Sequence, residues 1–234
     1  GTSWTQIGGD GIASSWNSGN KAVRSAISYG GNLYAGLGDG GNDADVWKYN
    51  GSSWTQIGGD GIASSWNSGN ISRTTALAND GTNLYAANGA NTAAGDVYRY
   101  NGTTWTKIGG ASLNGSWVSN PRSTTGALVY ANSKLYATPW GSSAGGEAWE
   151  YDGSNWTMIG GNFVNESWGG ATVTRIASST VMNSKVYFGL GGGVNSAQVY
   201  EYDGTTARRI GGSALAGSWP VNTYEEVTAL MAYK

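Results

Sequence analysis

The feature that most constrains this sequence is a repeat of about 51 residues. The phrase Gly-x-x-Trp-x-x-Ile-Gly-Gly occurs four times, and a fifth copy has Ala207 in place of the tryptophan. A Ser-Trp pair follows each copy, and successive pairs are 50, 51, 51 and 51 residues apart. A period of this length is typical of repeated supersecondary units, which bury their apolar faces only against their neighbours. The phrase tryptophans are Trp4, Trp54, Trp105 and Trp156, and the pair tryptophans are Trp16, Trp66, Trp117, Trp168 and Trp219.

Each repeat is expected to form four short antiparallel strands. Asn-Gly and Asp-Gly turns separate the third strand from the fourth, and such turns favour hairpins because both residues tolerate positive φ. The chain shows no sustained 3.6-residue apolar period, so helices are not expected. Four strands per repeat are typical of a propeller blade. In the second repeat the predicted strands are Arg73–Ala78, Asn83–Ala87, Asp96–Tyr100 and Thr104–Ile108.

The sequence therefore predicts an all-β fold, a single β-propeller domain of four-stranded antiparallel blades over residues 1–234. The repeats are approximately 1–50, 51–101, 102–152 and 153–203, with a partial repeat at 204–234. Five copies each of the inner and outer strand but four copies of the two middle strands indicate five blades, the fifth incomplete. Residues 1–9 and 227–234 would then share that fifth position. The alternative is a four-bladed ring with a surplus strand at each end.

Composition excludes several classes of function. The chain has no Cys and no His, which removes thiolate catalysis, disulfides, cysteine zinc sites and the Ser-His-Asp triad. Thirteen basic and fifteen acidic residues give a net charge of −2, so no basic field for nucleic acid is expected. No apolar run of about 18 residues is present, so membrane insertion is not expected. We expect no cofactor and no metal site.

The carboxylates argue against an enzyme. Glycosidases need one special pair of carboxylates, whereas most acidic residues here recur with the repeat, such as Asp45, Asp96 and Glu147. Repeated equivalent positions favour multivalent binding, in which weak sites combine into useful avidity. We therefore expect no catalytic residues.

The Ser-Trp pairs are the candidate binding positions. An exposed indole face stacks on the apolar face of a pyranose, and nearby amide groups hydrogen-bond to its hydroxyls. The alternative is that each tryptophan is a wedge in the core between adjacent sheets, and the residues alone leave both interpretations open. The candidate sugar-binding residues are Trp16, Trp66, Trp117, Trp168, Trp219, Asn17 and Asn67.

The order of motifs resembles that of the tachylectin-type five-bladed propeller lectins. The matching elements are Asn83-Leu84-Tyr85-Ala86, Trp105, Ile108-Gly109-Gly110 and Trp117, with their counterparts in each repeat. The resemblance implies binding of sugars, particularly N-acetylated hexosamines, in pockets repeated between blades. Two departures are a longer segment between Gly-Gly and the following tryptophan, and the two middle strands that the last blade lacks. Kelch and sialidase-type propellers share some of these motifs.

The expected function is therefore a multivalent, lectin-like carbohydrate-binding propeller, with glycans as partners and an extracellular or secreted location. The alternative is a structural or protein-interaction scaffold without catalytic activity, either a natural filament or adhesin module or a designed consensus propeller. An incomplete blade would leave unpaired strand edges, which readily accept strands from another chain. We therefore expect a homo-oligomer or filament formed through that blade.

Overall fold

The computed structural model describes most of the chain, and the statements below concern that part. The described residues are 3–17, 22–40, 43–66, 71–90, 95–118, 122–141, 145–161, 163–168, 173–193, 196–213, 215, 217–219 and 224–232. Within these ranges the regular structure consists of strands joined by turns and single-turn 3-10 helices. No helix in these ranges is long and apolar enough to cross a membrane.

The strands form four consecutive groups of four, which we call blades 1 to 4. Within each blade the chain runs back and forth, and neighbouring strands pair antiparallel in sequence order. Blade 1 contains β1 (Val23–Tyr29), β2 (Asn32–Leu37), β3 (Asp45–Tyr49) and β4 (Trp54–Gly58), and blade 2 contains β5 (Arg73–Asn79), β6 (Leu84–Gly89), β7 (Val97–Tyr100) and β8 (Trp105–Gly109). Blade 3 contains β9 (Thr124–Ala131), β10 (Lys134–Trp140), β11 (Ala148–Tyr151) and β12 (Trp156–Gly160), and blade 4 contains β13 (Arg175–Met182), β14 (Lys185–Gly191), β15 (Gln198–Tyr202) and β16 (Ala207–Gly212).

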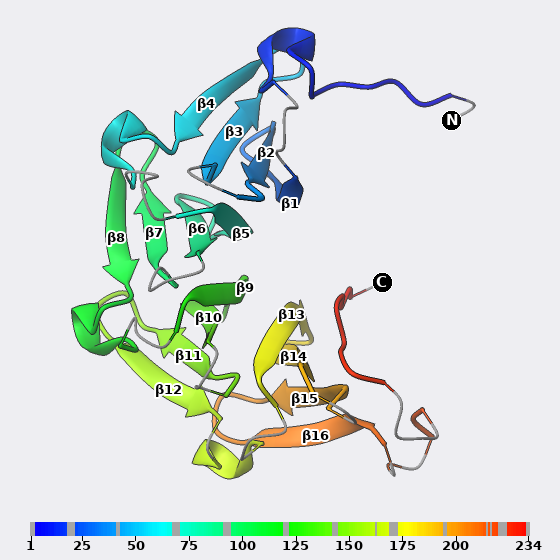
Figure 1. The fold of residues 1–234 in the computed structure, drawn as a ribbon. Helices are drawn as coiled ribbons and strands as arrows, with labels where there is room; N and C mark the ends of the chain where they lie inside the picture. Colours follow the sequence, from blue (N-terminus) through cyan, green and yellow to red (C-terminus); the bar gives the residue numbers. More distant parts are fainter. Residues whose placement is uncertain are drawn as a thin grey trace.

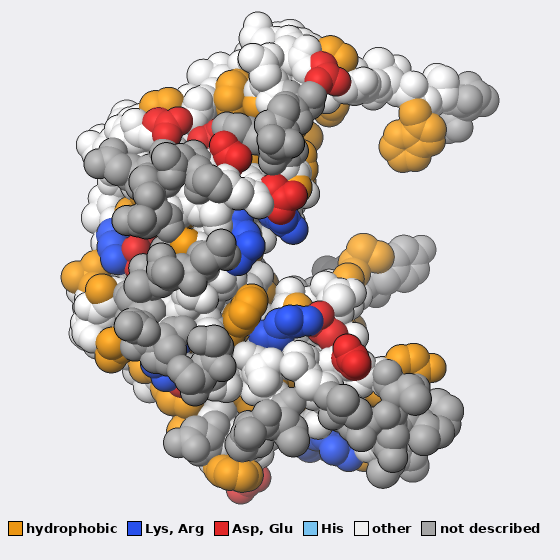
Figure 2. Space-filling view, in the orientation of Figure 1, with side chains coloured by type: hydrophobic (Ala, Val, Ile, Leu, Met, Phe, Trp, Pro, Cys, Tyr) orange, Lys and Arg blue, Asp and Glu red, His pale blue; other side chains and the backbone are white. Residues whose placement is uncertain are grey.

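The blades follow one another around an open arc, with the first strand of each on the concave side and the fourth on the convex side (Figure 1). A single bridge between Gly89 and Thr124 joins blades 2 and 3 into one eight-stranded sheet. In space-filling view a gap remains between the first and fourth blades (Figure 2). The prediction of an all-β, propeller-like fold with four-stranded blades is confirmed.

The hairpin between the third and fourth strands forms as its sequence indicates. In blade 1 the Asn50 Oδ1 accepts hydrogen bonds from the backbone N–H groups of Ser52 and Ser53, both at 2.9 Å. Gly51 has a φ of 100°, which a side chain would strain. Asparagine and glycine therefore close this turn by local chemistry.

Tryptophans of the Gly-x-x-Trp phrase seal the junctions between blades. Trp105 lies 3 % exposed, and its Nε1 donates to the backbone oxygen of Ile57 in the preceding blade at 2.7 Å. The ring covers Gly58, where an added Cβ would lie 2.9 Å from that same Nε1. Trp156 repeats this arrangement one blade later, with its Nε1 bonded to Ile108 at 2.8 Å. The glycine after each isoleucine is thus required by close packing.

A hydroxyl group of blades 2, 3 and 4 donates a hydrogen bond to the backbone of the inner segment that follows the blade. Thr75 Oγ1 donates to the backbone oxygen of Thr125, and Thr138 Oγ1 donates to that of Ile176 at 3.1 Å. Ser178 Oγ donates to the backbone oxygen of Val227 at 2.8 Å. The three acceptor positions are 51 residues apart. The segment around Val227 therefore takes the place beside blade 4 that an inner strand takes beside the preceding blade.

The backbone at the C-terminal segment extends this match. Glu226 forms an isolated antiparallel bridge with Gly191, and the Val227 N–H donates to the Leu190 oxygen at 3.1 Å. Arg175 forms an ion pair with Glu226. Blade 4 thus pairs with the segment that follows it in the repeat order, although no strand longer than a bridge forms there.

The prediction of an outer strand within residues 1–9 is wrong for the described positions 3–9. These residues form no strand, and the Trp4 side chain is fully exposed, at 102 %. The ribbon places this segment away from the C-terminal segment rather than in a shared blade (Figure 1). The physical reason is pairing, because an outer strand needs a third strand beside it, and the described chain places none there.

Candidate binding site between the first two blades

Four of the predicted sugar-stacking tryptophans are buried in the core. The exposed fractions are 8 % for Trp16, 3 % for Trp66, 1 % for Trp117 and 5 % for Trp168. Trp66 packs edge-on against Trp105, with ring centroids 5.3 Å apart. Buried rings leave no open face for a pyranose, so these residues have the core role that the sequence left as the alternative.

Hydrogen bonds fix the same tryptophans. The Nε1 atoms of Trp66, Trp117 and Trp168 donate to the backbone oxygens of residues 44, 95 and 146 at 2.6–2.7 Å. Each indole thereby ties a crossover segment to its blade. Of the remaining candidates, Trp219 is half-buried and Asn17 is exposed, whereas Asn67 lies outside the described residues.

The acidic residue that recurs with the repeat forms hydrogen bonds or ion pairs with other side chains of the protein. Asp45 accepts a hydrogen bond from Gln56 Nε2 at 2.9 Å, and Asp96 pairs with Lys107 at 2.8 Å. Glu147 forms an ion pair with Arg122. It also accepts a hydrogen bond from the Nε1 of Trp149 at 2.9 Å. Burial raises the pKa of Asp96, although the hydrogen bond and charge of Lys107 lower it in part. No group of three His, Cys, Asp or Glu side chains that could hold a metal occurs among the described residues.

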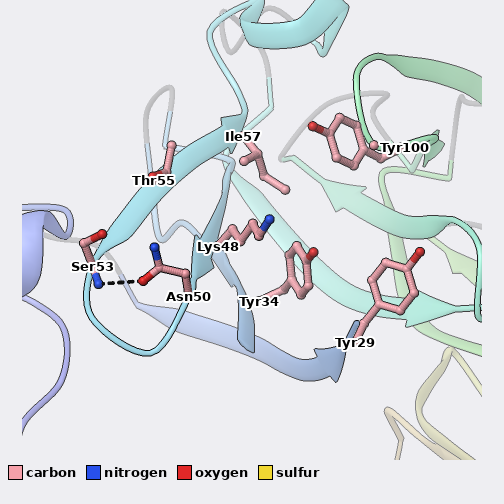
Figure 3. A pocket seen from close by; sticks show the side chains of 9 residues that line it. Tyr29, Tyr34, Lys48, Asn50, Ser53, Thr55, Ile57 and Tyr100 are labelled. Atoms are coloured by element: carbon pink, nitrogen blue, oxygen red, sulfur yellow. Dashed lines mark hydrogen bonds between the residues drawn. The ribbon is translucent and has the colours of Figure 1, made fainter. Parts of the chain in front are cut away.

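A pocket of about 270 Å³ opens between blades 1 and 2, and we call it the first junction pocket. Its volume lies just below the roughly 300–1,000 Å³ of most small-molecule sites. Figure 3 shows aromatic rings and polar side chains converging on this space. The lining residues are Tyr29, Tyr34, Lys48, Asn50, Ser53, Thr55, Ile57, Tyr100 and Gly102.

Both blades contribute to the pocket. Tyr29, Tyr34 and Lys48 come from β1, β2 and β3 of blade 1, and Tyr100 comes from the end of β7 in blade 2. The rings of Tyr29 and Tyr34 have centroids 5.8 Å apart at an interplanar angle of 36°. Tyr100 stacks on Trp105 at 4.9 Å, which fixes its ring at the junction. The pocket is therefore a property of two neighbouring repeats.

The polar side chains that line the pocket carry hydroxyl, amide and ammonium groups, all of which can donate hydrogen bonds. Tyr34 is 6 % exposed, and burial, followed by the charges of Tyr29 and Tyr100, raises its pKa. Its hydroxyl therefore stays protonated near neutral pH. The side chain of Lys48 points toward the same space (Figure 3), and no described residue forms an ion pair with it.

Most of these residues recur at the next two junctions. The positions of Tyr34, Asn50 and Tyr100 hold Tyr85, Asn101 and Tyr151 at the second junction, and Tyr136, Asp152 and Tyr202 at the third. Sequence reasoning used the tyrosines as landmarks of the repeat and assigned them no binding role. The signal that points to a site is the position of Lys48, which becomes Arg99, Glu150 and Glu201 in later repeats, whereas the positions of Tyr34 and Ile57 keep the same residue type.

Comparisons with known proteins show likeness in fold alone. No family model matches the chain, and no curated protein matches it. The sialidase of Trypanosoma rangeli is 12 % identical, with a TM-score of 0.53, over 82 % of this chain and 37 % of that chain. The β-propeller domain of the Trilobed protease from Pyrococcus furiosus is 11 % identical, with a TM-score of 0.49, over 81 % of this chain and 53 % of that one.

A protein of unknown function from Bacteroides thetaiotaomicron is 18 % identical, with a TM-score of 0.49, over 89 % of this chain and 50 % of that chain. The chain spans about a quarter to a half of the length of the solved structures it matches. At such identities the T. rangeli sialidase likeness supports the propeller-like fold of this chain and carries no activity over to it.

Proposed function

We propose that this protein is a multivalent carbohydrate-binding propeller whose sites lie between adjacent blades. The observation that carries the proposal is the first junction pocket, in which three tyrosines and several hydrogen-bonding groups surround a space sized for one sugar. The positions of Tyr34 and Tyr100 are also tyrosines at the second and third junctions. Aromatic faces with a few convergent polar groups are the general chemistry of sugar recognition.

N-acetylated hexosamines are the proposed ligands, supported by the resemblance to tachylectin-type lectins. An acetamido group needs one donor, one acceptor and an apolar contact for its methyl. Asn50, Thr55 and Ile57 supply these three kinds of group along one wall of the first junction pocket. Asn50 Oδ1 is engaged by the hairpin backbone, which turns its amide nitrogen into the available donor.

We further propose a five-bladed arrangement with an incomplete fifth blade, through which copies of the chain associate. Support comes from the segment at Glu226 and Val227, which contacts blade 4 as an inner strand of a next blade would. An inner strand without middle strands leaves backbone groups unpaired, and these accept strands from a second chain.

Two further proposals accompany this function. An extracellular or secreted location suits a glycan-binding role, and the absence of catalysis is supported by the partners of the repeated carboxylates. Glu147, Glu150 and Glu201 each face a cation of the chain itself. The second candidate function, an interaction scaffold, is favoured by the gap between the first and fourth blades (Figure 2).

Retention on immobilised N-acetylglucosamine tests the proposal with a matched pair of variants. Tyr100→Ala removes a wall of the first junction pocket and should reduce retention. Tyr49→Ala changes the residue at the same repeat position in blade 1, which has no described blade before it, and should leave retention unchanged. Equal effects of the two variants, with circular dichroism unchanged, would refute sugar binding at the junctions.

A further inference from the structure

The tyrosines at 51-residue spacing allow four versions of one environment to be compared. Tyr34, Tyr85, Tyr136 and Tyr187 are 6 %, 6 %, 2 % and 7 % exposed. In blade 2 the Tyr85 hydroxyl donates to Asp80 Oδ2 at 2.7 Å. Burial, the hydrogen bond and the charge of Asp80 raise the pKa of Tyr85. In blade 2 the tyrosine hydroxyl therefore donates its hydrogen bond to a carboxylate of the protein itself.

In blades 3 and 4 the carboxylate near this tyrosine is a glutamate at another repeat position. The Tyr187 hydroxyl donates to Glu201 Oε2 at 3.0 Å, and Lys185 pairs with the same carboxylate at 2.8 Å. In blade 3, Glu150 is the cross-strand partner of Tyr136 and forms an ion pair with Lys134, and burial and then the charge of Glu150 raise the pKa of Tyr136. Both glutamates come from the third strand of their blade. In blade 2 the cross-strand partner of Tyr85 is Arg99, so each of blades 2 to 4 has a carboxylate and a cation near this tyrosine.

The first blade lacks the carboxylate. The repeat position of Asp80 holds Tyr29, and the position of Glu150 and Glu201 holds Lys48. None of the nine residues that line the first junction pocket is acidic. The Tyr29 hydroxyl donates to the backbone oxygen of Thr82 at 2.5 Å and is therefore already used. Tyr34 and Lys48 remain as a donor and a cation facing an empty volume.

We infer that the first junction pocket binds a carboxylate from outside the chain, held by the Tyr34 hydroxyl and the Lys48 ammonium, and that this carboxylate belongs to a uronic acid residue of a glycan. The ligand supplies from outside the carboxylate that Asp80, Glu150 and Glu201 supply to the tyrosines of the other blades. This inference rests on the proposed sugar-binding function and adds that the first junction prefers an acidic sugar to the neutral N-acetylated hexosamines proposed for the junctions in general. Charge-assisted hydrogen bonds are about twice as strong as neutral ones, so the carboxylate would dominate recognition.

The shape of the pocket favours a sugar acid over an acidic side chain of a protein. A volume of about 270 Å³ exceeds the needs of a carboxylate alone and accommodates one pyranose ring. Tyr29 and Tyr100 supply aromatic faces on two sides of this space (Figure 3). Asn50 and Thr55 lie on the wall of β4 and its hairpin, where ring hydroxyls need partners.

The first experiment titrates the whole chain with small ligands and follows binding by isothermal calorimetry. Methyl glucuronide is compared with methyl glucoside, which has the same ring without the carboxylate, and with N-acetylglucosamine and N-acetylglutamate amide. We expect glucuronide to bind at least about tenfold more tightly than glucoside, as hydrogen bonds to charged groups imply. If N-acetylglutamate amide bound as tightly as methyl glucuronide, the assignment of the ligand to a sugar would be overturned.

Variants locate the effect. Lys48→Met should reduce glucuronide affinity by about tenfold or more, and Tyr34→Phe should weaken it without changing the packed volume. Lys48→Glu recreates the residue of blades 3 and 4 and should abolish glucuronide binding. Arg208→Met removes the same charge from a side chain that is 74 % exposed on blade 4 and should have no effect. Undiminished binding by Lys48→Met would overturn the inference.

A gain of binding gives the sharpest test. Asp80→Asn removes the carboxylate beside Tyr85 and Arg99 but keeps an oxygen for the turn hydrogen bonds from Thr82 and Asn83. We expect a second glucuronide site and a stoichiometry that rises from one to two per chain. An unchanged stoichiometry in a folded variant would contradict the role given to the carboxylate.

The outcomes separate this inference from the proposed function. Binding of N-acetylglucosamine with no preference for glucuronide would overturn the acidic-sugar site and leave the lectin function standing. Failure of every sugar to bind would overturn both.

Discussion

Residues 3–20 and 53–70 have identical sequences, yet their described parts adopt two different structures. The turn that begins at Gly9 or Gly59 is the same in both copies. Gly11 and Gly61 have φ values of 74° and 75°, and Ala13 and Ala63 have 52° and 53°. The preceding stretch differs, because residues 54–58 form β4 whereas residues 3–7 form no strand.

The difference separates what a segment specifies alone from what its neighbours impose. The turn is held by hydrogen bonds within itself, such as Ile62 N to Gly59 O at 2.9 Å, which the first copy repeats at 3.0 Å. The strand depends on pairing with β3, and an isolated strand is unstable in water. Identical residues therefore give identical turns but not identical strands.

The largest difference between the two copies is expected when the tryptophan of each is replaced by alanine. Trp54 is 5 % exposed and Trp4 is 102 % exposed. Trp54→Ala should lower the free energy of unfolding by about 3–5 kcal/mol, the usual cost of deleting a buried aromatic. Trp4→Ala should change it by less than about 0.5 kcal/mol. Urea denaturation measures both, and equal losses would show that Trp4 packs in solution.

A smaller effect is expected at the glycine that follows the isoleucine. An added Cβ at Gly58 would lie 2.9 Å from Trp105 Nε1, and at Gly8 it would lie 3.0 Å from Trp54 Nε1. Gly58→Ala should cost about 1–3 kcal/mol, since β4 is held in its sheet and cannot move away. Gly8→Ala should cost less, because the unpaired segment can shift. Thermal denaturation of the two variants decides, and a larger loss for Gly8→Ala would contradict this account.

The smallest effect is expected in the turn that has the same structure in both copies. Ala13 and Ala63 both lie in the left-handed region, which costs an L-residue roughly 1–2 kcal/mol and glycine almost nothing. Glycine has a larger conformational entropy in the unfolded state, and this offsets about 0.5–1 kcal/mol of the stabilisation. Ala13→Gly and Ala63→Gly should therefore each stabilise the protein slightly and equally. A difference between them in chemical denaturation would mean that the turns are not locally determined.

The repeat made most of the fold predictable. The expected strand Arg73–Ala78 is observed as Arg73–Asn79, and Thr104–Ile108 as Trp105–Gly109. Turn residues and alternation carry this information locally. The N-terminal strand was predicted wrongly because the motif was identical to that of β4, while the partner strand it needs is not part of the motif.

The candidate site was much harder to predict. The tryptophans drew attention because large aromatics serve both cores and sugar sites, and only their burial distinguishes the two roles. The first junction pocket depends on Tyr34 and Tyr100, which are 66 positions apart in sequence and on different blades. No single repeat contains the pocket, so a search for motifs within one repeat cannot reveal it.

Because the first junction pocket takes residues from two blades, the proposed unit of binding is the seam between repeats and not the repeat itself. A row of blades has one seam fewer than it has blades, whereas a ring has as many seams as blades. Tyr49 shows the cost of an open row, since it holds the position of Tyr100 with no described blade in front of it. Under the proposed function, closing the arc would raise the number of binding sites per blade without any change of residue, and duplication of one repeat would add one complete site.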